Sequence, residues 1–522
     1  MAYDLDRRRV LGVGAGLAAG LLAGGLAACG SGSGSSPSAS SSGSGSAAGA
    51  KRGGTLRYGA AAGNAGDSPD PAVAARTLQL AIAANCYDTL TFADEDYKLS
   101  PSLATEWTPS NGARTWSFKL RSGVTFHDGT KLTSKDVAYS FKRVLDPTLA
   151  ASALGNISPY LAASGIDSSD PTTITFNLLK PNAFFPVIVS AVSLSIVKDG
   201  ATNFATGNGT GPFSITSFDP AARLTLTRNH NYWKNGLPYL DAVQYVVIAD
   251  DTTRLQALTT GSEDVADNIT GASTELLTGN VRPYMLKAGG WVGLTMFGDT
   301  APFNNPKVIQ AMQYAADRSK IMSVVAPGIN ILAPDMPIPP SDPFYPAGMT
   351  PKAYDPDKAK SLLKSAGLSD LDINLWAYEG DKLDTVVSYK STAAAAGINV
   401  NVENVPHATF FSDDFLKKPA IGISVARLHI AQALPELYSK GGALNLTHFD
   451  NPQLDQLVTA AVSSTDEATQ KKNFTDALTI ISDSAANVIP GWEGQVYGLG
   501  SRVNGMLATN GGQVYQTSTW LS

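Results

Sequence analysis

The stretch Trp116–Gly129, with the sequence WSFKLRSGVTFHDG, says most about how this chain folds. Trp116, Phe118 and Leu120 alternate with other residues in a pattern that predicts a strand with one buried face. The sequence His-Asp-Gly at 127–129 then indicates a turn. We expect the aromatic residues of this stretch to pack in a core and not to contact a ligand.

Strands and helices are also expected on either side of this stretch. Thr133 and Asp136 predict a helix start, with a capping hydroxyl and an acid in the first turn. Residues 54–59 alternate as a strand does, 73–86 have the composition of an apolar helix, and a further strand is expected over 372–375. The remainder mixes strands and helices, divided by many Gly and Pro turns.

The N-terminal residues 1–28 resemble an export signal, with arginines at 7–9 and a Gly/Ala-rich apolar stretch after them. The signal ends in the lipobox-like sequence Leu-Ala-Ala-Cys, so we expect Cys29 to be the lipidated first residue of the mature protein. Two acyl chains give stable membrane anchoring. Residues 29–51 form a Gly/Ser-rich tether. Both the Sec and the twin-arginine route fit this signal, and an unlipidated signal peptide is the alternative.

Composition narrows the classes of function. Hydrophobic residues make up 43% and charged residues 16% of the 522 residues, which is ordinary for a soluble globular protein. The length predicts two or three domains. The net charge of −6 argues against a nucleic-acid partner, which needs a basic surface. Cys86 is the only cysteine after Cys29, and we expect it to be a buried structural thiol.

The sequence contains none of the common catalytic or metal-binding motifs. H-E-x-x-H, G-x-S-x-G and Cys/His clusters are absent, and the five histidines are scattered. His127 beside Asp128, and the glycines of 207–211, are interpreted as parts of the fold and not as a catalytic pair or a phosphate site. The absence of these motifs is weak evidence by itself, so the prediction that the protein is not an enzyme and has no metal or cofactor rests on the family resemblance described next.

Several motifs resemble, in the same order, those of the family 5 extracellular solute-binding proteins of ABC transporters. The motifs are Tyr87–Leu90, Leu99–Ala104, Trp116–Phe141, Gly209–Phe213, Arg228–Trp233, Ala311–Arg318 and Asn451–Asp455. The resemblance covers about 52–522. It implies an α/β, two-lobed periplasmic-binding-protein-like fold of type II, with an extra inserted domain and a ligand cleft between the lobes.

The family order of the motifs also implies how the chain is divided. Lobe I would combine 52–82, 207–288 and 491–522, the inserted domain would span 83–206, and lobe II would span 289–490. The chain would then cross between the lobes near 286–291 and again near 490–492. Hinge closure about these crossings would bury the ligand.

The resemblance implies a lipid-anchored substrate-binding component of an ABC importer, located outside the cytoplasm and monomeric. It would capture a peptide or peptide-like solute, an oligosaccharide or another small organic ligand, and deliver it to the membrane permease. A surface sensor or adhesin that keeps the binding fold is one alternative. A hydrolase of the cell envelope is another.

One departure from the family bears on the ligand. Peptide-binding members usually carry a motif of the type W-x-x-D-x-P-D-P, whose aspartate holds the peptide amine, but residues 423–432 lack it and contain Arg427 and His429. A buried cation needs a compensating anion, so we expect Arg427 to hold a carboxylate of the ligand; a solvated surface loop is the alternative. The candidate ligand contacts are Asn85, Trp376, Tyr378, Arg427, His429 and Trp492, of which the aromatic residues are also candidates for the core.

Overall fold

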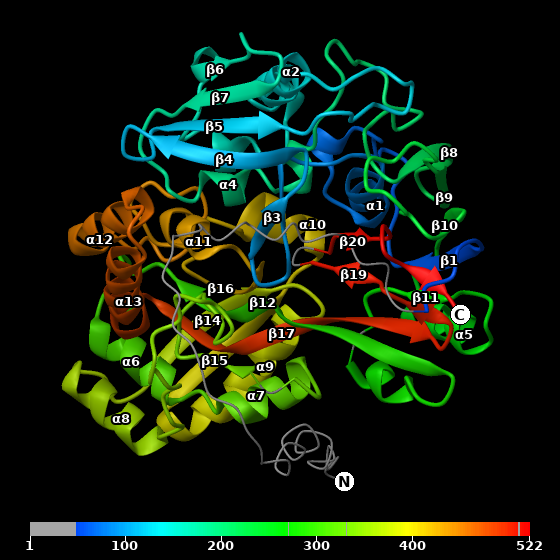
Figure 1. The fold of residues 1–522 in the computed structure, drawn as a ribbon. Coiled ribbons are helices and arrows are strands. Elements are labelled where there is room, and N and C mark those ends of the chain that lie inside the picture. The colour runs from blue at the N-terminus through cyan, green and yellow to red at the C-terminus, as the bar shows by residue number, and fades with distance from the viewer. Residues whose placement is uncertain (1–48, 270, 330, 510–511) are drawn as a thin grey trace, which may run out of the picture. The chain divides into compact units, whose positions relative to one another are not determined.

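The computed structural model describes residues 49–522, except 270, 330 and 510–511 (Figure 1). The predicted signal segment, the lipidation site at Cys29 and nearly all of the tether lie outside these residues. Among the helices of the described part, none has the length and apolar character that a membrane crossing requires.

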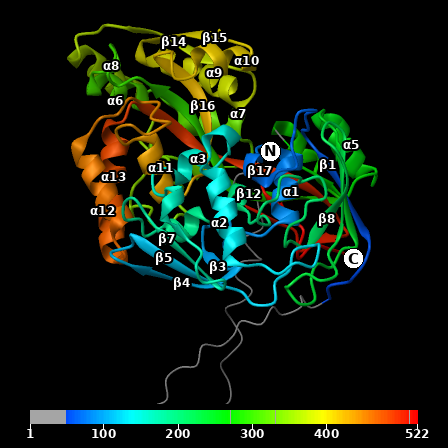
Figure 2. The same cartoon turned by 90° about the horizontal axis from the view of Figure 1, so that it is seen from above.

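A mixed sheet of eleven strands runs through both lobes in the described part of the chain. The lobe I side contains β1 (Thr55–Ala60), β8 (Phe213–Asp219), β9 (Arg223–Arg228), β10 (Ala242–Val247) and β11 (Val265–Ala266). The lobe II side contains β14 (Leu371–Ala377), β15 (Ile398–Asn404) and β16 (Ala420–Ala426). Between them lie β12 (Val281–Met296) and β17 (Asn487–Gly500), as Figure 2 shows. The eleventh strand, β13 (Ile331–Leu332), pairs with β17.

The long strands β12 and β17 connect the two sides of the sheet. Residues 281–286 of β12 pair with 495–500 of β17, next to β11, whereas 290–296 of β12 pair with β16. The register between β12 and β17 shifts between Leu286 and Gly290. Both crossings expected from the sequence fall within these two strands. The residue boundaries given above for the lobes and the insertion remain our prediction.

Lobe II has helices on both faces of its sheet. One face packs against α6 (Pro306–Tyr314), α7 (Arg318–Val325), α8 (Pro356–Ser365) and α9 (Asp381–Ala393). The other packs against α11 (Ile430–Leu437), α12 (Pro452–Ser463) and α13 (Glu467–Ser484). Along β12, Trp291 belongs to the second core, whereas Leu294 and Met296 belong to the first, because successive side chains of a strand point to opposite faces.

The inserted region forms its own sheet, in the order β4 (Ala104–Ser110), β5 (Thr115–Leu120), β7 (Thr173–Asn177) and β6 (Ile166–Asp167). The helix α2 (Ser134–Val144) packs on it. Phe118, Phe141, Phe176 and Phe185 form an aromatic core whose ring centroids lie 4.8–6.2 Å apart. The core role expected for the aromatic residues of Trp116–Gly129 is confirmed.

Several local predictions are confirmed, and one helix start is corrected. The expected strand at 54–59 is β1, and α2 begins after Thr133, whose backbone N–H donates to Asp136 Oδ2 at 2.7 Å. The helix expected over 73–86 begins only at Thr77, as α1 (Thr77–Cys86). The reason is Asp70, which accepts a hydrogen bond from the Ala72 N–H and so stabilises a 3-10 turn over 71–73 instead.

The glycines of 207–211 allow close packing. The ring of His127 lies within hydrogen-bond distance of the carbonyl oxygens of Gly207 (2.8 Å) and Gly211 (2.9 Å). A Cβ atom on Gly211 would lie 2.5 Å from the carbonyl carbon of Cys86. Cys86 itself is fully buried, and burial raises the pKa of its thiol well above the usual value. These residues therefore hold the end of α1 against the loop 207–211, as their structural interpretation predicts.

Candidate ligand cleft

A cavity of about 240 Å³ lies between segments from both lobes and the inserted region. Its lining includes Tyr97, Val187, Ile188 and residues 190–194 from the inserted region, and Ala426, Arg427, Leu428 and Gln432 from lobe II. Thr509, Gln513 and Tyr515, near the C-terminus, complete it. Segments more than 400 positions apart in the sequence thus meet at one cavity, in the region where the fold implies a ligand.

Arg427 follows β16 and is the buried cation of this cavity. Only 2% of its side chain is exposed, and its backbone N–H donates to the Gly289 carbonyl at 2.9 Å. Its Nη1 donates to the Glu95 carbonyl at 3.1 Å and lies 3.7 Å from Asp96 Oδ1. The structure therefore contradicts the alternative of a solvated surface arginine.

Two donors of Arg427 remain unused. Its Nε and Nη2 atoms are buried and find no acceptor among the described residues. A buried donor without an acceptor costs free energy, and a charged donor costs more. Guanidinium groups favour bidentate contact with a carboxylate, but both atoms are covered by protein, so a ligand carboxylate reaches them only after the covering side chains move.

His429 lies two positions after Arg427 but does not add positive charge. Its Nδ1 accepts a hydrogen bond from the Ala431 N–H at 3.2 Å, which caps α11. Burial, together with the neighbouring Arg427 cation, lowers the pKa of His429 to about 3. The ring is therefore neutral at physiological pH, with its proton on Nε2, and it packs against the rings of Tyr97 and Phe184 at 5.3 and 5.0 Å.

Asn85 lies one layer behind the cavity wall and does not contact the cavity, although the sequence made it a candidate ligand contact. It is fully buried in α1, donates to the carbonyl oxygens of Ala81 and Val514, and accepts from the Gln516 N–H. These bonds fix β20 (Val514–Tyr515), whose Tyr515 lines the cavity. The amide of Asn85 thus supports the wall.

The three predicted aromatic contacts do not line this cavity. Trp492 is fully buried in β17, where it pairs with Trp291 in the core beneath α11. Trp376 was expected to follow a strand that ends at 375, but β14 continues to Ala377 because Trp376 pairs with both neighbouring strands. Tyr378 packs against the rings of His407, Phe410 and Phe411 at 4.9–5.7 Å.

Tyr97 is a cleft residue that sequence reasoning missed. It lies in the turn between β2 (Thr91–Ala93) and β3 (Leu99–Pro101), with a φ of 60°, and its hydroxyl donates to the Arg427 carbonyl at 2.8 Å. The acidic residues 94–96 signal a turn. Nothing in the local sequence places that turn against a residue 330 positions away.

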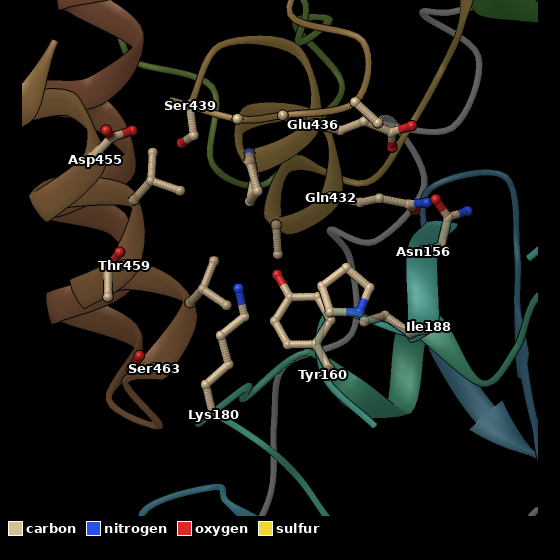
Figure 3. A pocket seen from close by; sticks show the side chains of 18 of the residues that line it. Asn156, Tyr160, Lys180, Ile188, Gln432, Glu436, Ser439, Asp455, Thr459 and Ser463 are labelled. Carbon is tan, nitrogen blue, oxygen red and sulfur yellow. The ribbon is translucent and has the colours of Figure 1, made fainter. Parts of the chain in front are cut away.

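A second cavity, of about 410 Å³, lies between the inserted region and the helices α11 and α12 (Figure 3). Figure 3 shows Asn156, Gln432 and Glu436 on one side and Asp455, Thr459 and Ser463 on the other, with Tyr160 and Lys180 between them. In the described residues, no group of three or more His, Cys, Asp or Glu side chains is arranged to hold a metal ion.

Comparisons with known proteins identify the family of this chain. The family model of the bacterial extracellular solute-binding proteins, family 5, matches residues 98–428. The glutathione-binding protein GsiB of Escherichia coli K12 is 27% identical over 435 residues, which cover 79% of this chain and 84% of the relative.

Two solved structures show the same architecture. The periplasmic binding protein DppA of Helicobacter pylori, in complex with the peptide STSA, has a TM-score of 0.75 and 25% identity, covering 90% of this chain and 98% of that one. AgaA of A. tumefaciens R10, in complex with agropinic acid, has a TM-score of 0.74 and 24% identity, covering 90% and 99%. At that identity AgaA is evidence for the fold alone.

Proposed function

The chain belongs to the bacterial extracellular solute-binding proteins of family 5, and on this premise we propose that it is the lipid-anchored substrate-binding component of an ABC importer. It captures a peptide or peptide-like solute outside the cytoplasm and delivers it to a membrane permease. The relatives support this solute class, since GsiB is named for glutathione and DppA was solved with a peptide.

The buried guanidinium of Arg427 carries the proposal for the ligand. Where peptide-binding members of the family usually have an aspartate that holds an amine, this chain has a cation with two unused donors that lines a cavity. The ligand therefore presents a carboxylate, or a similar acceptor, at this end of the cleft. His429 does not compete for that anion, because its ring is neutral.

Native mass spectrometry of the purified protein, followed by calorimetry, tests this function. A co-purified molecule is identified, and its affinity is measured for the wild type and for Arg427→Gln. Loss of the charged hydrogen bonds is expected to weaken binding by about 1.5–3 kcal/mol.

The matched control is Arg223→Gln, which removes an exposed arginine in β9 and should leave affinity unchanged. Unchanged affinity in a folded Arg427→Gln variant would contradict the anionic-ligand assignment. Recovery of a chemically altered molecule after incubation would favour an enzyme over a binding protein.

A further inference from the structure

The two cavities adjoin each other. Asn156, Ile188 and Gln432 line both the 240 Å³ cavity at Arg427 and the 410 Å³ cavity beneath α12. Small-molecule sites in proteins usually enclose about 300–1,000 Å³. The cavity at Arg427 alone is smaller than that, whereas the two together fall within the range.

The helix α11 leads from the junction into the second cavity. Gln432 lies at the junction, and Glu436 follows four positions later, so the two side chains lie on the same face of the helix. Figure 3 shows both on one side of the cavity, near Asn156. A helix rises about 1.5 Å per residue, so Glu436 lies roughly 6 Å beyond the junction.

Glu436 is a half-buried carboxyl group without a partner. Its side chain makes no hydrogen bond or ion pair that the described part of the chain shows, and burial raises the pKa of this carboxyl. Asp455, in the same cavity, already accepts from the Lys440 N–H at 3.2 Å, and the Lys440 ammonium pairs with Asp450. Lys180 lies over the Tyr160 ring at 4.6 Å. A carboxylate that loses water without gaining a cation is unfavourable.

We propose that the two cavities form one elongated site for a zwitterionic peptide-like ligand, with its carboxylate at Arg427 and its free amine at Glu436. This inference rests on the proposed function and names the residue that selects for the amine. Ile430 to Glu436 alone rises roughly 9 Å, and an extended peptide gains about 3.5 Å per residue. The site therefore fits a peptide of about three residues, which contacts both the inserted region and lobe II.

A tripeptide library with free termini tests the proposal, together with the same library N-acetylated and C-amidated. Retention of peptides on the purified full-length protein is measured by mass spectrometry. N-acetylation is expected to weaken retention about tenfold in the wild type, because a charged hydrogen bond is lost. In Glu436→Gln, free and acetylated peptides should be retained equally. The matched control Glu467→Gln removes an exposed carboxylate outside the lining of both cavities and should keep the wild-type preference. Asp455→Asn tests the other carboxylate of the second cavity, and the melting temperature of each variant shows that it is folded.

The outcomes separate this inference from the proposed function. If free and acetylated peptides bind the wild type equally well and Glu436→Gln changes nothing, the second cavity is not part of the site, but peptide capture stands. If only Asp455→Asn removes the preference, the amine lies at α12 and the assignment to Glu436 is wrong. If no library is retained in any form, the peptide class and the elongated site both fail.

Discussion

At the residue scale, the neutrality of His429 has a measurable effect on stability. Its pKa is about 3 in the folded protein, against an ordinary value of 6.5. Between these values the folded state therefore binds fewer protons than the unfolded state. The contribution of His429 to the free energy of unfolding is complete above pH 6.5 and is lost as the pH falls below that value. His429→Asn retains an acceptor for capping α11 but cannot titrate.

Urea unfolding at pH 7 and pH 5 checks this prediction. Between these pH values the wild type should lose about 2 kcal/mol more unfolding free energy than His429→Asn, since one pKa unit corresponds to about 1.4 kcal/mol. His230→Asn, at an exposed position, is the control and should behave like the wild type. Equal pH slopes for all three proteins would show that His429 titrates normally.

Cys29 is predicted to be the membrane anchor, on the basis of the lipobox-like sequence and the tether after it. Cys29→Ser should release the protein into the medium or leave an unprocessed precursor, because acylation requires the thiol. Cell fractionation and the mass of the mature chain measure this. Cys86→Ala leaves the signal intact and should stay in the membrane fraction. An unchanged membrane fraction and mass in Cys29→Ser would refute the anchor.

The residue scale also shows how far sequence reasoning reaches. Arg427 could be singled out because the family resemblance leads us to expect an aspartate at about this place in peptide-binding members. Its burial could not be predicted, because the atoms that cover it belong to Glu95, Asp96 and Tyr97, far away in the sequence. Trp492 is the opposite case. An aromatic residue after a proline suits a core as well as a cleft, and only the packing of the folded chain decides between the two.

At the element scale, the turn between β2 and β3 holds the end of β16 in place. Tyr97 adopts a left-handed backbone conformation, which is unfavourable for a bulky residue, and its hydroxyl bonds the Arg427 carbonyl. Tyr97→Phe keeps the ring against His429 but removes this bond. Ligand affinity is expected to fall by about 0.5–1.5 kcal/mol, the usual value of one hydrogen bond.

Calorimetry with the co-purified ligand measures the effect, and Tyr345→Phe is the control. Tyr345 donates its hydroxyl to the Met349 carbonyl, within its own loop and outside the lining of the cavity at Arg427. If Tyr97→Phe binds as tightly as the wild type, the turn covers the cleft without holding it.

Elements whose borders depend on local signals were predictable, whereas borders set by tertiary contacts were not. The start of α2 follows from Thr133 and Asp136, which cap it within four residues. The start of α1 is delayed by Asp70, which also pairs with Arg143, 73 positions away. The end of β14 depends on its two neighbouring strands, so the strand runs through Trp376.

At the scale of the whole described fold, β12 and β17 hold the two strand crossings expected from the sequence and are the natural hinge. The ladder between them is interrupted between Leu286 and Gly290, and a bulge of this kind lets paired strands bend. The order of the motifs leads us to expect two crossings, because it divides lobe I among distant segments. The shift in register depends on backbone geometry that no motif records.

Ligand binding is therefore expected to close the lobes about this hinge, and small-angle scattering should show a smaller radius of gyration with the true ligand. At about 100 times its Kd, the ligand also adds about 2.7 kcal/mol to stability.

Closure depends on contacts made from both sides at once, since Arg427 belongs to lobe II whereas Thr509 and Tyr515 come from the C-terminal segment. Arg427→Gln should consequently need a higher ligand concentration to reach the same compact state. A ligand that calorimetry confirms, but that leaves the wild-type scattering profile unchanged, would show that the cleft is closed before the ligand arrives.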